Sequence, residues 1–220
     1  MGRATARRVD PTYYPETDHM GEGLLHRLVS ELLRTLVASW LAERKVRACV
    51  GANQFIYYRE HAPTVSVAPD VYVLPGVDPN LTFSSWKTWE RGVVPSFAFE
   101  CVSEDWLKDY RDGPPKYGEL GTAELVIFDP EHAASPKERV RWQMWRRVAR
   151  RGLVQVLATN DDRVRSKVLG CWLRAMGEDD ELRVRLASGV RGETVLPTDA
   201  ERAEAAERAL ARMRAERDVR

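Results

Sequence analysis

Two short apolar runs, each carrying one carboxylate, constrain the fold of this chain more than any other feature. Asp70 begins the run Asp70–Leu74, and Glu100 lies within the run Ser96–Val102. Runs of β-branched and aromatic residues such as these are typical of strands that pack into a core. An ionised carboxylate in or beside a buried strand is costly unless a cation compensates its charge. The pair therefore predicts a sheet in which Asp70 and Glu100 hold a hard divalent cation.

The remaining pattern predicts one long helix followed by several strands. Leucines and Trp40 recur at helical spacing from Gly21 to Glu43. Runs bounded by Pro, Gly or Asp then predict strands, and two later runs lie at hairpin distance from each other. We expect an α/β fold with strands at Gln54–Tyr58, Asp70–Leu74, Ser96–Val102, Glu124–Phe128, Arg139–Val148 and Gly152–Ala158.

Length and charge favour one domain with two flanking segments. The 220 residues suffice for one substantial core, which we expect at residues 20–197, after a polar N-terminal arm at residues 1–19. Residues 198–220 are rich in Glu and Arg and carry a narrow apolar stripe, which predicts a helix and a homo-oligomer formed through it. The stripe consists of Ala203, Ala206, Leu210 and Met213, and Thr198 or Asp199 is a suitable N-cap.

Composition restricts the partners and the compartment. The chain has 34 basic and 33 acidic side chains, a net charge of +1, so any nucleic-acid surface must be local. Its three cysteines lack metal-ligand spacing and favour a reducing compartment. No segment approaches the ~20 apolar residues of a membrane span. We expect a cytoplasmic protein without a membrane partner.

Motif order gives a more specific expectation. The chain resembles the bacterial Uma family of restriction-endonuclease-like proteins, in the PD-(D/E)XK nuclease superfamily. The resemblance covers most of the chain, and its ordered motifs are Tyr13-Tyr14-Pro15-Glu16, Glu22 with His26, Ala68-Pro69-Asp70-Val71, Trp86 with Trp89, Glu100 with Ser103, Asp109, Tyr117, Gly121, Glu124 and Asp129-Pro130. The acidic and basic C-terminal helix is also common in that family.

This resemblance implies a restriction-endonuclease-like core, a mixed β-sheet flanked by helices, and a function in hydrolysing DNA. Asp70 and Glu100 would hold Mg²⁺, with Mn²⁺ as a substitute, and the carbonyl of Cys101 would add a ligand. Such an ion activates water and stabilises charge on the phosphate. By family position, Glu22 assists at the metal, while His26 and Tyr117 lie where nucleic acid binds.

The chain departs from the family at the catalytic lysine. The superfamily places that lysine two residues after the second acid, where this chain has Val102, and the Uma family usually moves it to the position of Gly113. Lys116 and Lys108 are the nearest substitutes. Helical side chains lean towards the N-terminus, so Lys116 can cover the surface that a residue at 113 would reach. We expect Lys116 to position the attacking water, on a helix that begins close to it.

Each assignment has a structural alternative. Asp70 can close a turn at a strand start, and Glu100 can be an edge-strand charge paired with an arginine. Glu22 suits a helix N-terminus, His26 can be an ordinary part-buried histidine, and Glu31 is the fallback acid. The missing lysine motivates a different class of function, a catalytically degenerate nuclease fold that acts as a DNA-binding or oligomeric interaction module.

Aromatic and basic side chains give two weaker indications. Trp86 and Trp89 can stack on bases, although a tryptophan pair is more often part of a core. Alternate arginines of one strand region can face phosphates, although a solvated strand face is the simpler interpretation. These arginines are Arg141, Arg146, Arg147, Arg150 and Arg151.

Overall fold

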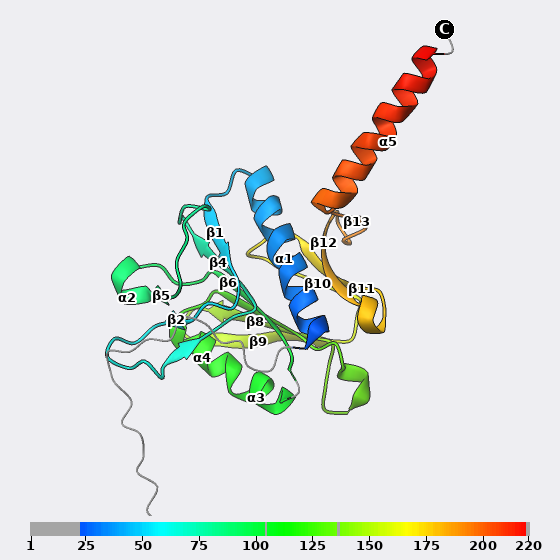
Figure 1. The fold of residues 1–220 in the computed structure, drawn as a ribbon. Coiled ribbons are helices and arrows are strands. Elements are labelled where there is room, and N and C mark those ends of the chain that lie inside the picture. Colours follow the sequence, from blue (N-terminus) through cyan, green and yellow to red (C-terminus); the bar gives the residue numbers. More distant parts are fainter. Residues whose placement is uncertain (1–22, 104, 136, 219–220) are drawn as a thin grey trace, which may run out of the picture.

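The computed structural model describes residues 23–103, 105–135 and 137–218. The predicted N-terminal arm at residues 1–19 and the candidate Glu22 lie outside this described part. Within it, helices surround a central sheet, and a long C-terminal helix projects from the body (Figure 1). No helix of the described ranges is both long and apolar enough to cross a membrane.

The central sheet has six strands in the order β1-β4-β6-β7-β8-β9. Only β6 and β7 run parallel, and the other neighbours are antiparallel. The connection between the two parallel strands is a helical crossover, as parallel pairing requires. The strands are β1 (Ala48–Gly51), β4 (Val71–Pro75), β6 (Phe97–Cys101), β7 (Glu124–Phe128), β8 (Trp142–Val148) and β9 (Gly152–Thr159).

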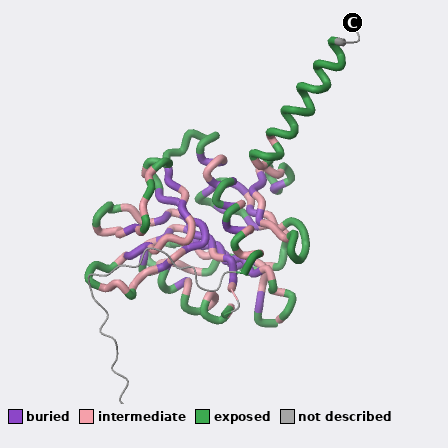
Figure 2. The backbone as a smooth tube through the Cα atoms, viewed as in Figure 1, coloured by how far each residue is buried: buried purple, intermediate pink, exposed green. Residues whose placement is uncertain are grey.

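Helices cover both faces of this sheet. Helix α1 (Leu24–Glu43) packs its leucines and Trp40 against one face, and α3 (Trp106–Arg111) and α4 (Gly113–Leu120) form the crossover on the other. Because side chains alternate along a strand, Val71 and Val73 of β4 join the core under α1, whereas Tyr72 and Leu74 join the core under α4. Figure 2 shows the buried residues gathered in this centre.

Two smaller sheets complete the body. A four-stranded antiparallel sheet packs against α1, so one core joins it to the central sheet. Its strands are β10 (Arg163–Arg165), β11 (Trp172–Met176), β12 (Arg183–Ser188) and β13 (Thr194–Val195). The other sheet consists of β2 (Ile56–Tyr57), β3 (Ser66–Val67) and β5 (Trp86–Lys87). Short helices are α2 (Thr88–Arg91), η1 (His132–Ala134) and η2 (Asp179–Glu181), and α5 (Asp199–Asp218) ends the described chain.

The predicted fold class, a mixed sheet flanked by helices with a C-terminal helix, is confirmed. The strand predicted at Gln54–Tyr58 is shorter in the structure, where only Ile56 and Tyr57 form a strand, and this strand belongs to the small sheet. The strand predicted from Arg139 begins at Trp142, since Arg139 is held in a buried ion pair before it. The sheet β10–β13 was not predicted.

Candidate active site

Asp70 is fixed immediately before β4, at a point where three elements meet. Its Oδ2 accepts the backbone N–H of Cys101, at the end of β6, at 2.6 Å. Its Oδ1 lies 2.6 Å from Nε2 of His26, in the first turn of α1. The side chain is 5% exposed, so this carboxylate is buried beside its polar partners.

Glu100 lies beside Asp70 because of the strand register. Val71 of β4 pairs with Phe99 of β6 in an antiparallel ladder. Asp70, which precedes Val71, therefore lies opposite Glu100, which follows Phe99. Alternation along β6 turns Glu100 away from α1 and towards α4, where the hydroxyl of Tyr117 donates a hydrogen bond to its Oε1. Burial raises the pKa of Glu100 well above its usual range, and the nearby charge of Asp70 raises it further.

The electrostatics of this pair suit a hard cation. Two adjacent carboxylates in a buried place repel each other, and a divalent ion between them would remove that repulsion. Mg²⁺ commonly takes one or two carboxylates and completes its shell with waters and phosphate oxygens. In the described ranges no three His, Cys, Asp or Glu side chains converge as a metal-binding group. An ion held by these two carboxylates would keep several non-protein ligands.

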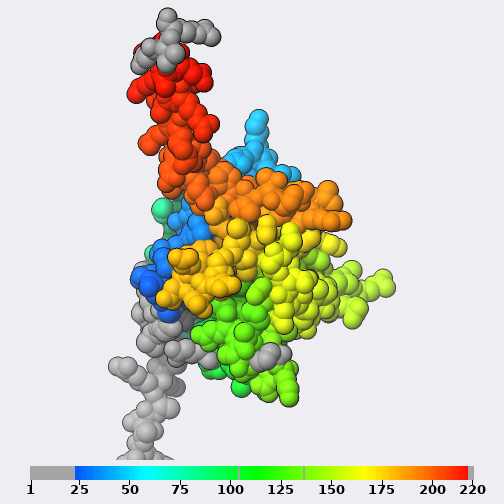
Figure 3. Space-filling model, turned by 90° about the vertical axis from the view of Figure 1, so that its right-hand side faces the viewer, coloured from blue at the N-terminus to red at the C-terminus, as the bar shows by residue number. Residues whose placement is uncertain are grey.

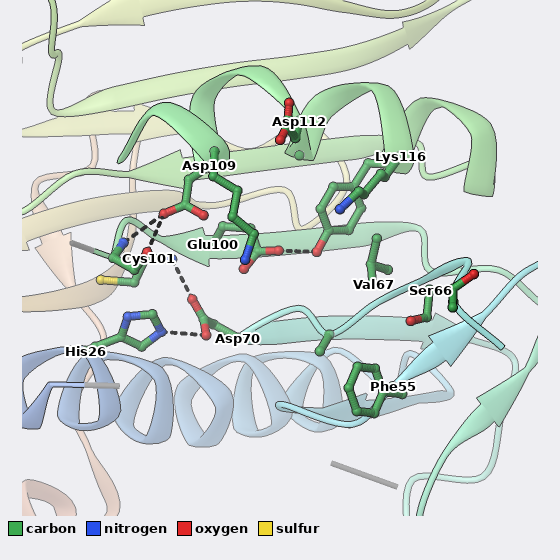
Figure 4. Close-up of a pocket in the computed structure, with 16 residues that line it drawn as sticks. His26, Phe55, Ser66, Val67, Asp70, Glu100, Cys101, Asp109, Asp112 and Lys116 are labelled. Carbon is green, nitrogen blue, oxygen red and sulfur yellow. Dashed lines mark hydrogen bonds and ion pairs between the residues drawn. The ribbon is translucent and has the colours of Figure 1, made fainter. Parts of the chain in front are cut away.

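Both carboxylates open on a cavity of about 350 Å³ (Figure 4). Its lining carries four carboxylates and two lysines, together with small and apolar residues from the segment between β2 and β4. The lining residues are His26, Phe55, Thr64, Ser66, Val67, Ala68, Asp70, Glu100, Cys101, Ser103, Lys108, Asp109, Asp112, Gly113, Lys116 and Tyr117. The acids outnumber the lysines, so this cavity favours a cation over an unaccompanied phosphate.

The crossover helices bring both candidate lysines to the cavity. Lys108 lies on α3 and Lys116 on α4, and both side chains are largely exposed. Figure 4 shows Lys116 extending from α4 over the same side of the sheet as Glu100. Helix α4 begins at Gly113 with two prolines in its first turn, close to Lys116 as predicted. Asp112 precedes it without a side-chain capping hydrogen bond.

Gly113, the family position of the lysine, also lines the cavity. A Cβ added there would meet no atom within 4 Å. The glycine is therefore not required by close packing, and a longer side chain at this position has room.

Two further residues of the cavity, Asp109 and Tyr117, hold neighbouring residues in place through hydrogen bonds. Asp109 accepts hydrogen bonds from the backbone N–H and the hydroxyl of Ser103, at 2.8 and 2.9 Å, and so fixes the loop between β6 and α3. Tyr117 is 1% exposed and holds the Glu100 carboxylate. Its predicted contact with nucleic acid stays a prediction, as do the roles of His26 and the Cys101 carbonyl.

Other candidates from the sequence have structural roles. Trp86 is 1% exposed and donates its indole N–H to the Val93 carbonyl, so it belongs to the core. Arg146 donates to the buried Glu124 at 2.7 Å, and Arg147 donates to the Thr122 carbonyl at 3.1 Å. These two arginines join β8 to β7 and to the residues just before β7.

The wall formed by Phe55, Thr64 and Ser66 was missed by sequence reasoning. These residue types occur throughout loops and strand ends, and no charge or spacing marks them. Only the packing of the β2–β3 segment beside Asp70 brings them to the cavity.

The chain is similar to one protein family and to solved structures. The model of a family named Uma2 and described as "Putative restriction endonuclease" matches residues 18–174. Among solved structures, a protein described as "a putative nuclease belonging to DUF820 from Anabaena variabilis" is similar at 13% identity, over 69% of this chain and 76% of that chain, with a TM-score of 0.46. No curated protein matches the chain.

Proposed function

We propose that this chain, which belongs to the Uma2 family of restriction-endonuclease-like nucleases, hydrolyses phosphodiester bonds of DNA with Mg²⁺ held by Asp70 and Glu100. The observation that carries this proposal is the pair of adjacent carboxylates at the cavity wall, the buried Asp70 and the part-buried Glu100. When bound, the ion would lower the pKa of a coordinated water and stabilise charge on the phosphate.

Named contacts prepare the acids for this role. The Cys101 N–H and His26 hold the two oxygens of Asp70, and Tyr117 holds one oxygen of Glu100. These hydrogen bonds reduce the reorganisation needed when ion and substrate bind. In this proposal the backbone carbonyl of Cys101 would be a further ligand, and Glu22 would be an assisting acid.

Lys116 supplies the positive charge that the acids lack. From α4 it would orient the attacking water and offset charge on the phosphate, with Lys108 on α3 as the alternative. Both lysines reach the cavity from the crossover between the parallel strands. We assign the water-positioning role to Lys116 because its helix, α4, also carries Gly113, the position at which the Uma family usually has its lysine.

The first test is cleavage of supercoiled plasmid and single-stranded DNA with Mg²⁺ or Mn²⁺. Asp70→Asn should lower the rate by ~100-fold or more, the scale of losing an electrostatic contact to the transition state. Asn keeps the size of a side chain that is buried and hydrogen-bonded, whereas Ala would leave the Cys101 N–H without its acceptor. Asp161→Ala, at an exposed loop position, is the matched control. Undiminished cleavage by Asp70→Asn would contradict the assignment.

The second test separates the lysines. Lys116→Met should abolish most cleavage and Lys108→Met should not, because Met keeps the length and removes the charge. Gly113→Lys would place an ammonium at the family position, where the structure has room for it, and should raise cleavage ~10-fold or more. Gly113→Met controls for the added bulk. A larger loss with Lys108→Met than with Lys116→Met would transfer the role to Lys108.

A second function, a catalytically degenerate module that binds DNA or assembles without cutting, is favoured by the glycine at 113. It predicts DNA retention in a gel-shift assay with no cleavage by the wild type under either metal. Cleavage that appears only in Gly113→Lys would support this alternative, because the scaffold would then be intact and lack one charge.

A further inference from the structure

Helix α5 stands clear of the rest of the molecule. Figures 1 and 3 show it rising from the body as a single rod. Its described side chains are all exposed apart from the part-buried Arg202 near its start. Most of the stability of a helix in a protein comes from packing, so a partner along its exposed faces would stabilise it.

The start of α5 is fixed to the body. Thr198 and Glu201 form a capping box, in which the Glu201 N–H donates to the Thr198 hydroxyl at 3.1 Å and the Thr198 N–H donates to Glu201 at 2.7 Å. Arg185 of β12 donates to both carboxylate oxygens of Glu201, at 3.1 and 2.6 Å. Arg202 pairs with Glu43 at the end of α1 at 2.8 Å. The body therefore sets the direction in which α5 projects.

An uncovered apolar stripe runs along the projecting part. Ala203, Ala206, Leu210 and Met213 recur at intervals of three and four residues, which places them on one face. Leu210 is 49% exposed and Met213 is 68% exposed. The two large side chains lie in the second half of the stripe and the two small ones in the first half.

Charge is segregated along the same helix. Residues 199–207 have four acidic side chains and one basic, and residues 208–218 have four basic and two acidic, so the halves carry net charges of −3 and +2. The helix dipole explains charge only within the first and last turns. Nearer the middle, Arg208 pairs with Glu204 at 3.4 Å within the helix. Glu207 and Arg212 add like charges three residues from Glu204 and four from Arg208.

We propose that α5 pairs antiparallel with α5 of a second copy, giving a two-fold symmetric homodimer. In this arrangement the acidic half of each helix faces the basic half of the other, which compensates the repulsion within each helix. The same arrangement places Ala203 opposite Met213 of the second copy and Ala206 opposite Leu210, so small residues face large ones. A parallel pair would instead bring equal charges together.

The oligomeric state tests this proposal without any reference to cleavage. Light scattering of the full chain over about 10–200 µM, a range suited to a small interface, should approach twice the 25.1 kDa of one chain. Leu210→Glu combined with Met213→Glu should leave a monomer at every concentration. Val190→Glu replaces an apolar residue that is 84% exposed on the body, and this control should dimerise as the wild type does. A monomeric wild type, or a double variant that still dimerises, would overturn the proposal.

Cross-linking tests the direction of the pair. The chain's own cysteines, Cys49, Cys101 and Cys171, are buried, so they contribute little background. Ala203→Cys and Met213→Cys should each remain uncross-linked alone under mild oxidation, and an equal mixture should form a disulfide-linked dimer. Disulfide dimers of either variant alone, without a mixed product, would show a parallel pair and overturn the antiparallel arrangement.

Discussion

At the scale of single residues, the buried ion pair of Asp129 with Arg139 is expected to have a large effect on stability. Asp129 is fully buried and accepts from Arg139 Nε at 2.7 Å and Nη2 at 2.6 Å. The Tyr110 hydroxyl donates to the same carboxylate at 2.8 Å, which ties α3 to the segment after β7. Because α3 also carries Lys108 and Asp109, the pair supports one wall of the cavity.

Asp129→Ala should lower the free energy of unfolding by about 3–5 kcal/mol, because it leaves a buried guanidinium without its main counter-charge. Urea denaturation followed by tryptophan fluorescence measures this. Glu119→Gln, which removes the exposed partner of Arg59, should cost less than about 1 kcal/mol. Equal effects of the two substitutions would show that burial of the Asp129 pair does not set its strength.

At the scale of elements, a helix and a strand that face the same core respond differently to an added methyl group. Gly118 lies inside α4, where a Cβ would meet only Leu153 at 3.6 Å. Gly118→Ala should stabilise the protein by about 0.5–1 kcal/mol through helix propensity. Gly51 of β1 faces the ring of Tyr72, which is fully buried and donates its hydroxyl to Gln54 at 2.7 Å. Gly51→Ala should therefore destabilise it by about 1–3 kcal/mol.

The two urea midpoints should move in opposite directions. Parallel far-UV circular dichroism of the folded variants checks that neither changes the secondary structure. A destabilised Gly118→Ala would mean that the contact with Leu153 is tighter than ordinary packing.

Local pattern explains which elements could be predicted. The strand Glu124–Phe128 has the predicted bounds, because four apolar residues in a row lie between turn residues. The unpredicted sheet β10–β13 carries Arg163, Arg174 and Arg185 in one cross-strand row, so charged residues interrupt its short apolar sequence. Arg174 pairs with Asp162, 12 residues away, and Arg185 pairs with Glu201, 16 residues away. Such pairing is not visible in a local window.

The candidate site divides in the same way. Asp70 and Glu100 stand out in sequence because a charge in an apolar run is unusual. The hydroxyl of Tyr117 that holds Glu100, and the cavity wall at Phe55, depend on how distant segments pack. The two candidate metal-binding acids could thus be predicted from residue type, whereas the residues that position them could be identified only from the fold.

At the scale of the whole molecule, the raised pKa values of a thiol and a phenol hydroxyl predict that the protein loses stability at alkaline pH. Burial raises the pKa of Cys171 from 9.0 to about 12, and burial also raises that of Tyr110 from 10.0 to about 12. The unfolded chain releases these protons first, so between about pH 9 and 12 it binds fewer protons than the folded chain. The free energy of unfolding therefore falls as pH rises through this window, and the full contribution is present only below it.

Cys171→Ala isolates one part of this effect. The thiol is 1% exposed and lies in the core that joins the two larger sheets, so its removal should lower stability at pH 8. Above pH 9, however, the variant should lose stability less steeply than the wild type, by up to about 1.4 kcal/mol per pH unit. Urea midpoints at pH 8, 9, 10 and 11 under reducing conditions measure both slopes. Identical slopes would mean that Cys171 ionises equally well in the folded state, which is incompatible with its burial between α1 and the second sheet.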